Sequence, residues 1–312
     1  MQSALIALVT AFALDCLLGD PPNRLHPVVA MGSLIRWATP TWNKGTPVSR
    51  FWAGVGLMLA GGALFAMPWL AIGLAWRGWP VWAQGILTGI LLKPMFAFRG
   101  LLRAGKEVQQ ALRAGDLLKA RQLVAWHLVS RDTSNLSGPQ VVSATIESLA
   151  ENLTDSFLAP LLYFSIGGLP LAWVYRFANT ADAMIGYRTP ELEWFGKFAA
   201  RLDDVLNWLP ARVAGLLLVV SAGLAQMDAR AAWKTMWQQH GRTASPNAGW
   251  TMAAAAGALG VILEKQDHYH LEGGPDWPGV QAIRQALGLV TVAIVLSLLL
   301  CGGVILGSRW LF

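Results

Sequence analysis

The chain is dominated by long apolar runs separated by shorter polar segments. A helix needs about 20 consecutive apolar residues to cross the hydrocarbon core of a bilayer. We therefore predict an all-α, polytopic integral membrane protein that forms a single membrane-embedded domain over residues 1–312. The predicted transmembrane runs are residues 3–18, 51–75, 81–98, 213–225 and 287–306.

The apolar run over residues 157–174 differs from these, because Pro160, Gly167, Gly168 and Pro170 interrupt it. If it crossed the membrane, the polar segments on its two sides would face opposite compartments. Irregular backbone at membrane depth is tolerated where protein covers it or where it lines a cavity. We therefore expect re-entrant or interfacial helices that carry one polar site within residues 131–208.

Composition supports a membrane location. Of the 312 residues, 54% are hydrophobic and 13% are charged, which is too apolar for an ordinary soluble domain. The 16 Trp residues fit aromatic belts at the membrane surfaces. No Lys/Arg run or interleaving of basic and aromatic residues suggests nucleic-acid binding, so the net charge of +6 is assigned to cytoplasmic loops and anionic lipid. Two cysteines within apolar runs exclude a disulfide framework.

Acidic residues are concentrated in the segment that carries the expected polar site. Nine of the 18 Asp and Glu residues lie there, at positions 132, 147, 151, 155, 182, 191, 193, 203 and 204. Glu147, Glu151 and Asp155 follow one another at helical spacing and would form one stripe. A stripe of like charges favours a bound cation, and oxygen ligands suit Mg²⁺. A solvated helix face is the alternative.

Arg131 begins a turn with four residues that can cap a helix: Asp132, Thr133, Ser134 and Asn135. Exposed N–H groups at such a turn, helped by an arginine, make a natural phosphate site. An ordinary N-cap explains the same residues equally well. Both interpretations are retained.

Two later blocks add polar residues at helical spacing. Asn179 and Asp182 lie three positions apart, and Arg188 follows Gly186. Arg201 and Asp204 are one turn apart and fit either a site or a structural ion pair. Adjacent Asp203 and Asp204 cannot both enter an apolar interior without a compensating metal, ammonium group or arginine.

Three further positions are weaker candidates. His26 follows a Gly-Asp-Pro-Pro helix break and is either a substrate contact or a hydrogen-bonding loop residue. Ser245 and Asn247 belong to a loop that either approaches a phosphate through its backbone or supports close helix packing. His268 and His270 are expected on the surface rather than on a metal.

Six blocks in this order resemble the adenosylcobinamide-phosphate synthase family of cobalamin biosynthesis, which consists of integral membrane proteins. They are LLGDPPNRLHPVVAMG, RDTSNL, IESLAEN with Asp155, NTADAMIGYR, FGKFAARLDDVLNWLPAR and SPNAGW. The resemblance covers nearly the whole chain. It implies an acid–amine ligase that uses ATP and Mg²⁺ to join adenosylcobyric acid to 1-amino-2-propanol or its phosphate. It leaves open which amine is used.

With this resemblance, five acids are expected to be catalytic: Glu147, Glu151, Asp155, Asp203 and Asp204. The first three are expected to hold Mg²⁺ and ATP, and Asp182, Asp203 and Asp204 are expected as further metal- or amine-binding acids. Phosphate and substrate contacts are expected from Arg131, Asp132, Thr133, Ser134, Asn135, Asn179, Asp182, Arg188, Arg201, Ser245, Asn247 and His26. No Walker A sequence is present. The expected partners are the corrinoid, the amino alcohol or its phosphate, membrane lipid and other membrane enzymes of the corrinoid pathway.

The resemblance also implies a multi-pass protein of the bacterial inner membrane whose site faces the cytoplasm. The basic segment at residues 99–121 is assigned to the cytoplasm by the positive-inside rule. Two other functions stay open at this point: a non-catalytic membrane sensor or regulator of the same superfamily, and a transporter. A transporter would place its acids in the middle of long spans.

Overall fold

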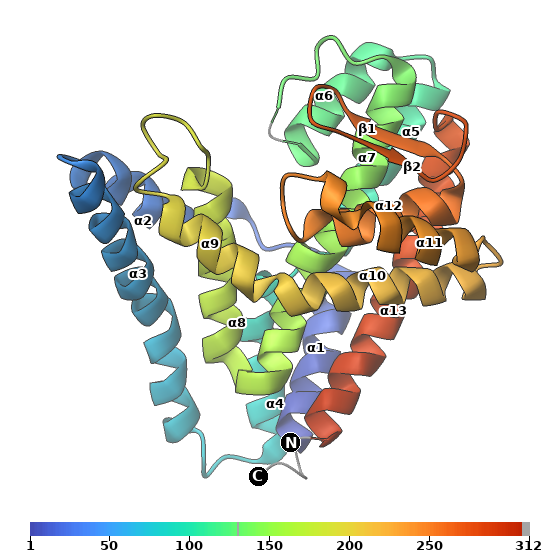
Figure 1. Ribbon diagram of the computed structural model, residues 1–312. Coiled ribbons are helices and arrows are strands. Elements are labelled where there is room, and N and C mark those ends of the chain that lie inside the picture. Colours follow the sequence, from blue (N-terminus) through green and yellow to red (C-terminus); the bar gives the residue numbers. More distant parts are fainter. Residues whose placement is uncertain (130, 308–312) are drawn as a thin grey trace. The chain divides into compact units, whose positions relative to one another are not determined.

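A computed structural model describes residues 1–129 and 131–307 (Figure 1). These residues form two compact units, each built from separate stretches of chain. Unit 1 contains Met1–Ala97, Ala159–Leu206 and the residues from Leu300 onward; unit 2 contains Phe98–Leu158 and Asn207–Leu299. The predicted all-α, polytopic membrane architecture is confirmed. The single domain over residues 1–312 stays a prediction.

Unit 1 consists of helices. They are α1 (Gln2–Leu18), η1 (Asn23–Leu25), α2 (Pro27–Trp42), α3 (Pro47–Ala75), α4 (Val81–Leu92), η2 (Lys93–Met95), α8 (Ala159–Ile185) and α9 (Lys197–Leu206). Proline stands at the first position of α2 and α3, where its missing N–H costs no hydrogen bond. Helices α1 and α4 pack closely at Gly89, where a Cβ would lie 2.7 Å from the Ala7 carbonyl oxygen.

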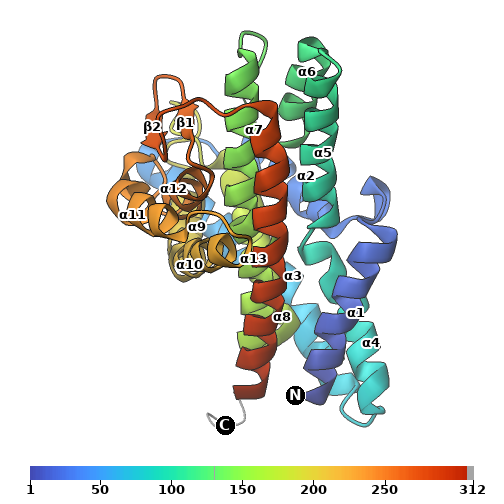
Figure 2. The same cartoon turned by 90° about the vertical axis from the view of Figure 1, so that its right-hand side faces the viewer.

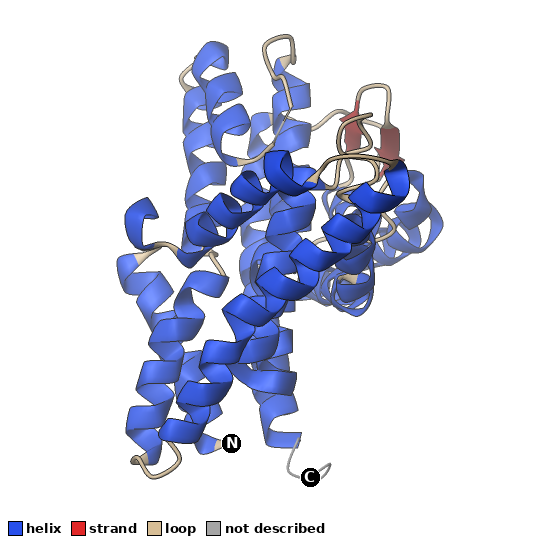
Figure 3. Ribbon diagram, turned by 90° about the vertical axis from the view of Figure 1, so that its left-hand side faces the viewer, coloured by secondary structure: helices blue, strands red, loops and turns tan. Residues whose placement is uncertain are grey.

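Unit 2 combines helices with one β-hairpin (Figure 3). Its elements are α5 (Arg99–Arg113), α6 (Leu117–His127), α7 (Gly138–Leu153), η3 (Thr154–Leu158), α10 (Trp208–Leu224), α11 (Ala229–Gln239), η4 (His240–Arg242), α12 (Ala248–Leu259), β1 (Ile262–Lys265), β2 (Tyr269–Glu272) and α13 (Val280–Gly307). The strands pair antiparallel, with Glu264 opposite His270. Figure 2 shows α5, α7 and α13 side by side, and Gly105 of α5 faces Leu149 and Leu287 of the other two.

Four helical stretches are long and apolar enough to cross a membrane: Pro47–Ala75, Val81–Arg113, Gly138–Ile185 and Val280–Gly307. They contain the predicted runs 51–75, 81–98 and 287–306. The other two predicted runs correspond to α1 and α10, which have 17 residues each. At 1.5 Å per residue these helices are about 26 Å long, short of a bilayer core of roughly 30 Å. Helix α10 is long and apolar enough to cross a membrane only together with α9, and a bend of 45° separates the two helices.

Helix α8 reverses direction at two glycines, although it belongs to the stretch Gly138–Ile185. Gly168 has φ 68° and ψ −160°, a conformation that is almost restricted to glycine. The rings of Tyr163 and Tyr175 stack with centroids 5.2 Å apart, whereas an unbroken α-helix would separate these residues by about 18 Å. The two arms of α8 are thus antiparallel, and the predicted bend within residues 157–174 is confirmed.

Candidate functional site

The predicted site residues are divided between the two units. Unit 2 holds Arg131, Asp132, Thr133, Ser134, Asn135, Glu147, Glu151, Asp155, Ser245 and Asn247. Unit 1 holds His26, Asn179, Asp182, Arg188, Arg201, Asp203 and Asp204. That the two sets form one site stays a prediction.

Glu147 is the centre of the polar cluster in unit 2. Its side chain is buried, with 5% of the residue exposed. Ser143 Oγ donates to its Oε1 at 2.6 Å, and the Tyr269 hydroxyl donates to its Oε2 at 2.7 Å. Arg131 Nη2 lies 3.8 Å from the same Oε2. Hydrogen bonds and a cation therefore compensate the buried carboxylate.

The partners of Glu147 fasten the β-hairpin to α7. Tyr269 belongs to β2, and Ser143 Oγ also accepts from the Glu264 N–H of β1 at 2.8 Å. Burial, followed by the nearby charge of Glu147, raises the pKa of Tyr269 above its usual range. The phenol therefore keeps its proton and stays a donor at neutral pH.

The other two acids of the predicted stripe lie further along this helical stretch. Glu151 and Asp155 are half-buried. Helix α7 ends at Leu153, and Thr154–Leu158 forms a π-helical turn, so spacing based on an α-helix no longer fixes the direction of Asp155. No three His, Cys, Asp or Glu side chains within residues 1–129 and 131–307 are arranged to hold a metal ion together. A Mg²⁺ ion held by one or two carboxylates, water and phosphate oxygens stays a prediction.

The turn around Asp132 is exposed and ordered by hydrogen bonds. Asp132 accepts from the Ser134 N–H and hydroxyl, each at 2.9 Å, and these bonds lower the pKa of Asp132. The side chain that caps α7 is Ser137, in a capping box with Gln140. The prediction that one of residues 132–135 caps this helix is thus wrong, because Ser137 occupies the cap; the phosphate assignment stays a prediction.

The Ser245 loop opens α12. Ser245 Oγ accepts from the N–H groups of Asn247 and Ala248 at 3.2 and 3.3 Å. Arg212 Nη1 lies 3.4 Å from Asn247 Oδ1, and its guanidinium stacks over Trp250, 4.8 Å from the ring centroid. These contacts agree with the close-packing interpretation of the loop. A phosphate contact there stays a prediction.

The two histidines after β1 lie outside any such cluster. His270 Nδ1 lies 2.9 Å from Glu264 Oε2, and its Nε2 lies 3.6 Å from Glu272 Oε1. His268 lies in the turn before β2. Neither histidine takes part in a metal-binding group among the described residues.

Unit 1 contains a buried charge cluster that the sequence analysis missed. Lys93 Nζ lies 2.7 Å from Asp15 Oδ1 and 2.6 Å from Asp20 Oδ1. Asp15 is fully buried in α1, and Lys93 is buried where η2 follows α4. Sequence offered two signals, Asp15 within the apolar run 3–18 and Lys93 within the run 81–98, and an ionisable residue in such a run is a functional candidate by default.

His26 lies beside this cluster. Its Nδ1 accepts from the Val28 N–H at 3.2 Å and so caps α2. Burial lowers the pKa of His26, an effect that Asp20 opposes and that Arg176 and Lys93 reinforce. The helix cap agrees with the hydrogen-bonding interpretation, and the substrate contact stays a prediction.

A hydrogen-bonded chain leads from α8 to α9. Arg176 Nη1 lies 3.4 Å from Asn179 Oδ1, and Asn179 Nδ2 donates to Asp203 Oδ1 at 3.3 Å. Asp203 is buried, whereas Asp204 is partly exposed and lies 3.6 Å from Arg201 Nη1. The adjacent acids therefore point to different partners, and neither enters an apolar interior without compensation.

Asp182 and Arg188 lie on either side of the turn that ends α8. A Cβ at Gly186 would collide with Asp182 Oδ1, so this turn requires glycine. Arg188 is exposed and interacts electrostatically with Asp204. The structure thus places Asp182, Arg188 and the two adjacent aspartates in the same unit.

Comparison with known proteins gives the family. Residues 8–297 match the family described as CobD/Cbib protein. The chain belongs to the CobD/CbiB family. It is 41% identical to "Cobalamin biosynthesis protein CobD" of Dehalococcoides mccartyi, with 98% of each chain covered. No solved structure matches the chain.

Other CobD/CbiB proteins are similar over almost their full length. "Probable cobalamin biosynthesis protein CobD" of Methanothermobacter thermautotrophicus is 41% identical, with 98% of this chain and 99% of the relative covered. "Cobalamin biosynthesis protein CbiB" of Salmonella choleraesuis is 36% identical, with 95% and 96% covered. The predicted family is thus confirmed, and with it a role in cobalamin biosynthesis.

Proposed function

We propose that this CobD/CbiB protein forms the amide bond between adenosylcobyric acid and 1-amino-2-propanol or its phosphate, at the expense of ATP. The observation that carries the proposal is the match to cobalamin biosynthesis proteins across 98% of the chain. The groups that carry out such a step have to be polar residues of a largely apolar protein. The two polar clusters are the candidates for it.

The reaction needs an activated carboxylate. Transfer of the terminal phosphoryl group of ATP to the carboxylate oxygen gives an acyl phosphate and ADP. The amine nitrogen then attacks the acyl carbon, the bond to the phosphate oxygen breaks, phosphate leaves with the electron pair, and the amine gives up a proton. Phosphoryl transfer of this kind depends mainly on positioning and on neutralisation of charge.

The acids of unit 2 are the proposed phosphate-handling residues. Bound Mg²⁺ would neutralise charge on the phosphate oxygens. Glu151 and Asp155, half-buried beyond Glu147, are its proposed ligands. Glu147 accepts hydrogen bonds from Tyr269 and Ser143, and we propose that these bonds hold in place the helix that carries Glu151. The turn from Arg131 to Asn135 is proposed as a phosphate contact.

The acids of unit 1 are the proposed amine-binding residues. Asp203 is buried and already accepts a hydrogen bond from Asn179, so an ammonium group would add the positive charge that a buried carboxylate favours. Asp204 and Asp182 are further candidates for the same role. We also propose that the protein resides in the bacterial inner membrane with its site facing the cytoplasm.

The test is amide formation by purified, detergent-solubilised protein given adenosylcobyric acid, aminopropanol phosphate, ATP and Mg²⁺. We expect Glu151→Gln to lower kcat by about 100-fold, the scale for loss of one preorganised charge-stabilising group. Asp204→Asn should raise the KM for the amine. Glu193→Gln is the matched control, since Glu193 is an exposed acid of the same region and should leave the rate unchanged.

Each outcome of this assay is informative. Product from the wild type with losses in the two site variants supports the reaction and the residue assignment. Product from all four proteins keeps the reaction but refutes the assignment. No product from folded wild-type protein, offered both the amine and its phosphate, refutes the proposed reaction.

A transport function is the second candidate, and the Asp15–Lys93–Asp20 cluster favours it, because ionisable residues within spanning segments mark substrate and ion paths. The three charges pair with one another, which also fits a purely structural role. Uptake of corrinoid into proteoliposomes without amide formation would support transport.

A further inference from the structure

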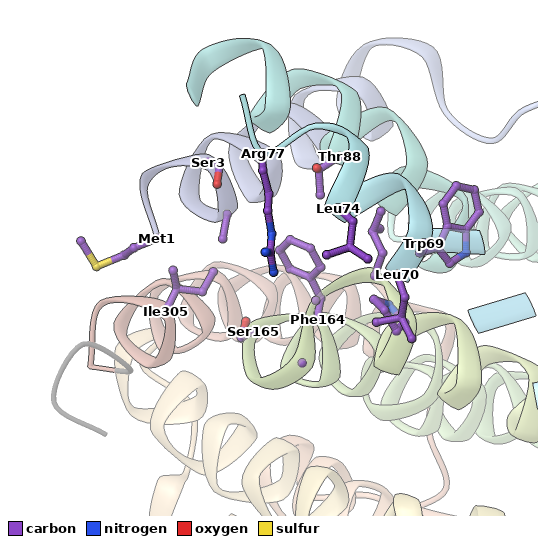
Figure 4. A pocket seen from close by; sticks show the side chains of 16 residues that line it. Met1, Ser3, Trp69, Leu70, Leu74, Arg77, Thr88, Phe164, Ser165 and Ile305 are labelled. Carbon is purple, nitrogen blue, oxygen red and sulfur yellow. The ribbon is translucent and has the colours of Figure 1, made fainter. Parts of the chain in front are cut away.

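Unit 1 contains a cavity whose lining includes none of the candidate site residues. It has a volume of about 680 Å³. The end of α3, the turn after it, the start of α1, Thr88 of α4 and the reversal of α8 line it, together with Ile305. Figure 4 shows the Arg77 side chain extending among these residues beside Phe164.

The walls of this cavity are largely apolar, and Arg77 is the one charged side chain among the described residues that line it. Leu70, Leu74, Phe164 and Ile305 contribute hydrocarbon surface, whereas Arg77 contributes a guanidinium group. Arg77 forms no ion pair or side-chain hydrogen bond with any residue in the ranges 1–129 and 131–307. A guanidinium above apolar walls complements an anion that carries a hydrocarbon tail.

The surroundings identify the class of such an anion. Leu64, Met67, Leu70 and Leu74 of α3 are each more than half exposed, and α3 is one of the stretches able to span the membrane. The cavity therefore continues into a helix face suited to acyl chains. Arg77 follows directly on the end of this span, and a residue just beyond a span is expected at the level of the phosphate headgroups.

A second donor is present on the cavity wall. The Trp69 indole Nε1 is buried and has no hydrogen-bond partner among the described residues. Buried indole N–H groups normally find an acceptor. Trp69 precedes Arg77 by about two helical turns. In a phospholipid whose phosphate binds Arg77, an ester carbonyl group would therefore lie near Trp69 Nε1 and could accept its hydrogen bond.

We propose that this cavity binds one anionic phospholipid, with its phosphate on Arg77, an ester carbonyl on Trp69 Nε1 and an acyl chain along the exposed face of α3. This lipid site is separate from the proposed amide-forming chemistry and does not depend on it. It makes the protein selective for an anionic headgroup over a zwitterionic one of the same chain length.

The experiment measures phospholipid retention by native mass spectrometry. Purified protein in mild detergent is titrated with phosphatidylglycerol and, separately, with phosphatidylcholine of the same chains. We expect the wild type to retain one phosphatidylglycerol and to prefer it. Arg77→Gln should weaken phosphatidylglycerol binding by roughly tenfold, the scale for loss of a charge-assisted hydrogen bond. Trp69→Phe should weaken binding of both lipids.

Two variants are controls. Arg77→Lys keeps the charge and should keep the preference, which separates loss of charge from misfolding. Arg36→Gln removes an exposed arginine of α2 outside the cavity lining and should change nothing. The proposal would be overturned if the wild type and Arg77→Gln preferred phosphatidylglycerol to the same extent. It would also be overturned if Arg36→Gln weakened phosphatidylglycerol binding as much as Arg77→Gln does. Displacement of the lipid by glycerol phosphate at similar concentrations would show a site for soluble phosphate instead.

Discussion

At the scale of single residues, Glu147 shows how one buried carboxylate orders distant parts of the chain. It is 122 positions from Tyr269, and the two side chains are joined by a 2.7 Å hydrogen bond. Ser143 donates to the same carboxylate and accepts from the backbone of β1. Removing one donor would leave a buried charged acceptor less satisfied, which costs more than an exposed hydrogen bond does.

We expect Tyr269→Phe to lower the stability of the protein by about 1.5–3 kcal/mol, the range for a hydrogen bond to a charged group. The melting temperature in detergent, followed by circular dichroism, measures the effect. The same change in a Glu147→Gln background should cost less, because the acceptor is then uncharged. Equal losses in the two backgrounds would show that the Tyr269 hydroxyl does not act through Glu147.

At the scale of elements, the reversal of α8 depends on glycine. Gly168 holds a positive φ, and the ring stack of Tyr163 on Tyr175 joins the two arms. Tyr163 also donates to the Leu206 carbonyl at 2.8 Å, which links the first arm to the end of α9. The bend therefore organises the helices that carry Asn179 and Asp203.

Gly168→Ala should destabilise unit 1, because an L side chain in that backbone conformation costs about 1–3 kcal/mol. Gly56→Ala is the matched control. Gly56 lies within α3 with nothing within 4 Å of an added Cβ, and alanine is the better helix former. A lower melting temperature for the first variant alone is the expected result; equal melting temperatures would argue against strain at the reversal.

The sequence predicted these elements unevenly, for physical reasons. Pro160, Gly167, Gly168 and Pro170 are local signals, so the bend was predictable. The direction of Asp155 was not, because a π-helical turn changes the period on which the acidic stripe was based. Pairings such as Glu147 with Tyr269 depend on tertiary folding, and no local pattern announces them. Lys93 was not predicted as a site residue, because the mean hydropathy of a long apolar run changes little with one charged residue.

At the scale of the whole molecule, the turns at the two ends of α3 indicate the membrane topology. Asn43 Nδ2 donates to the Glu191 carbonyl at 2.8 Å, and Arg50 also binds that carbonyl. The turn before α3 and the segment after α8 thus lie together, whereas the turn at residues 76–80 lies at the far end of α3. The reversal of α8 lines the same cavity as Arg77, beside that far end, and the second arm of α8 carries the chain back.

We expect single cysteines at Lys44 and Glu193 to react with a membrane-impermeant maleimide from the same side of sealed vesicles. A cysteine at Gly78 should react from the opposite side. The background lacks the two native cysteines, Cys16 and Cys301, of which the first is exposed and the second buried. Labelling of Glu193→Cys together with Gly78→Cys would show that α8 crosses the bilayer.

The ion pair between Asp15 and Lys93 has a consequence for biogenesis. Helix α1 is synthesised before α3 and α4 and carries a carboxylate, while the lysine that neutralises it follows α4. Placing one such charge at the centre of a bilayer costs about 2.5–3.5 kcal/mol on insertion scales. Helix α1 therefore enters lipid most favourably as a pair with α4, so its insertion is coupled to synthesis of the chain up to Lys93.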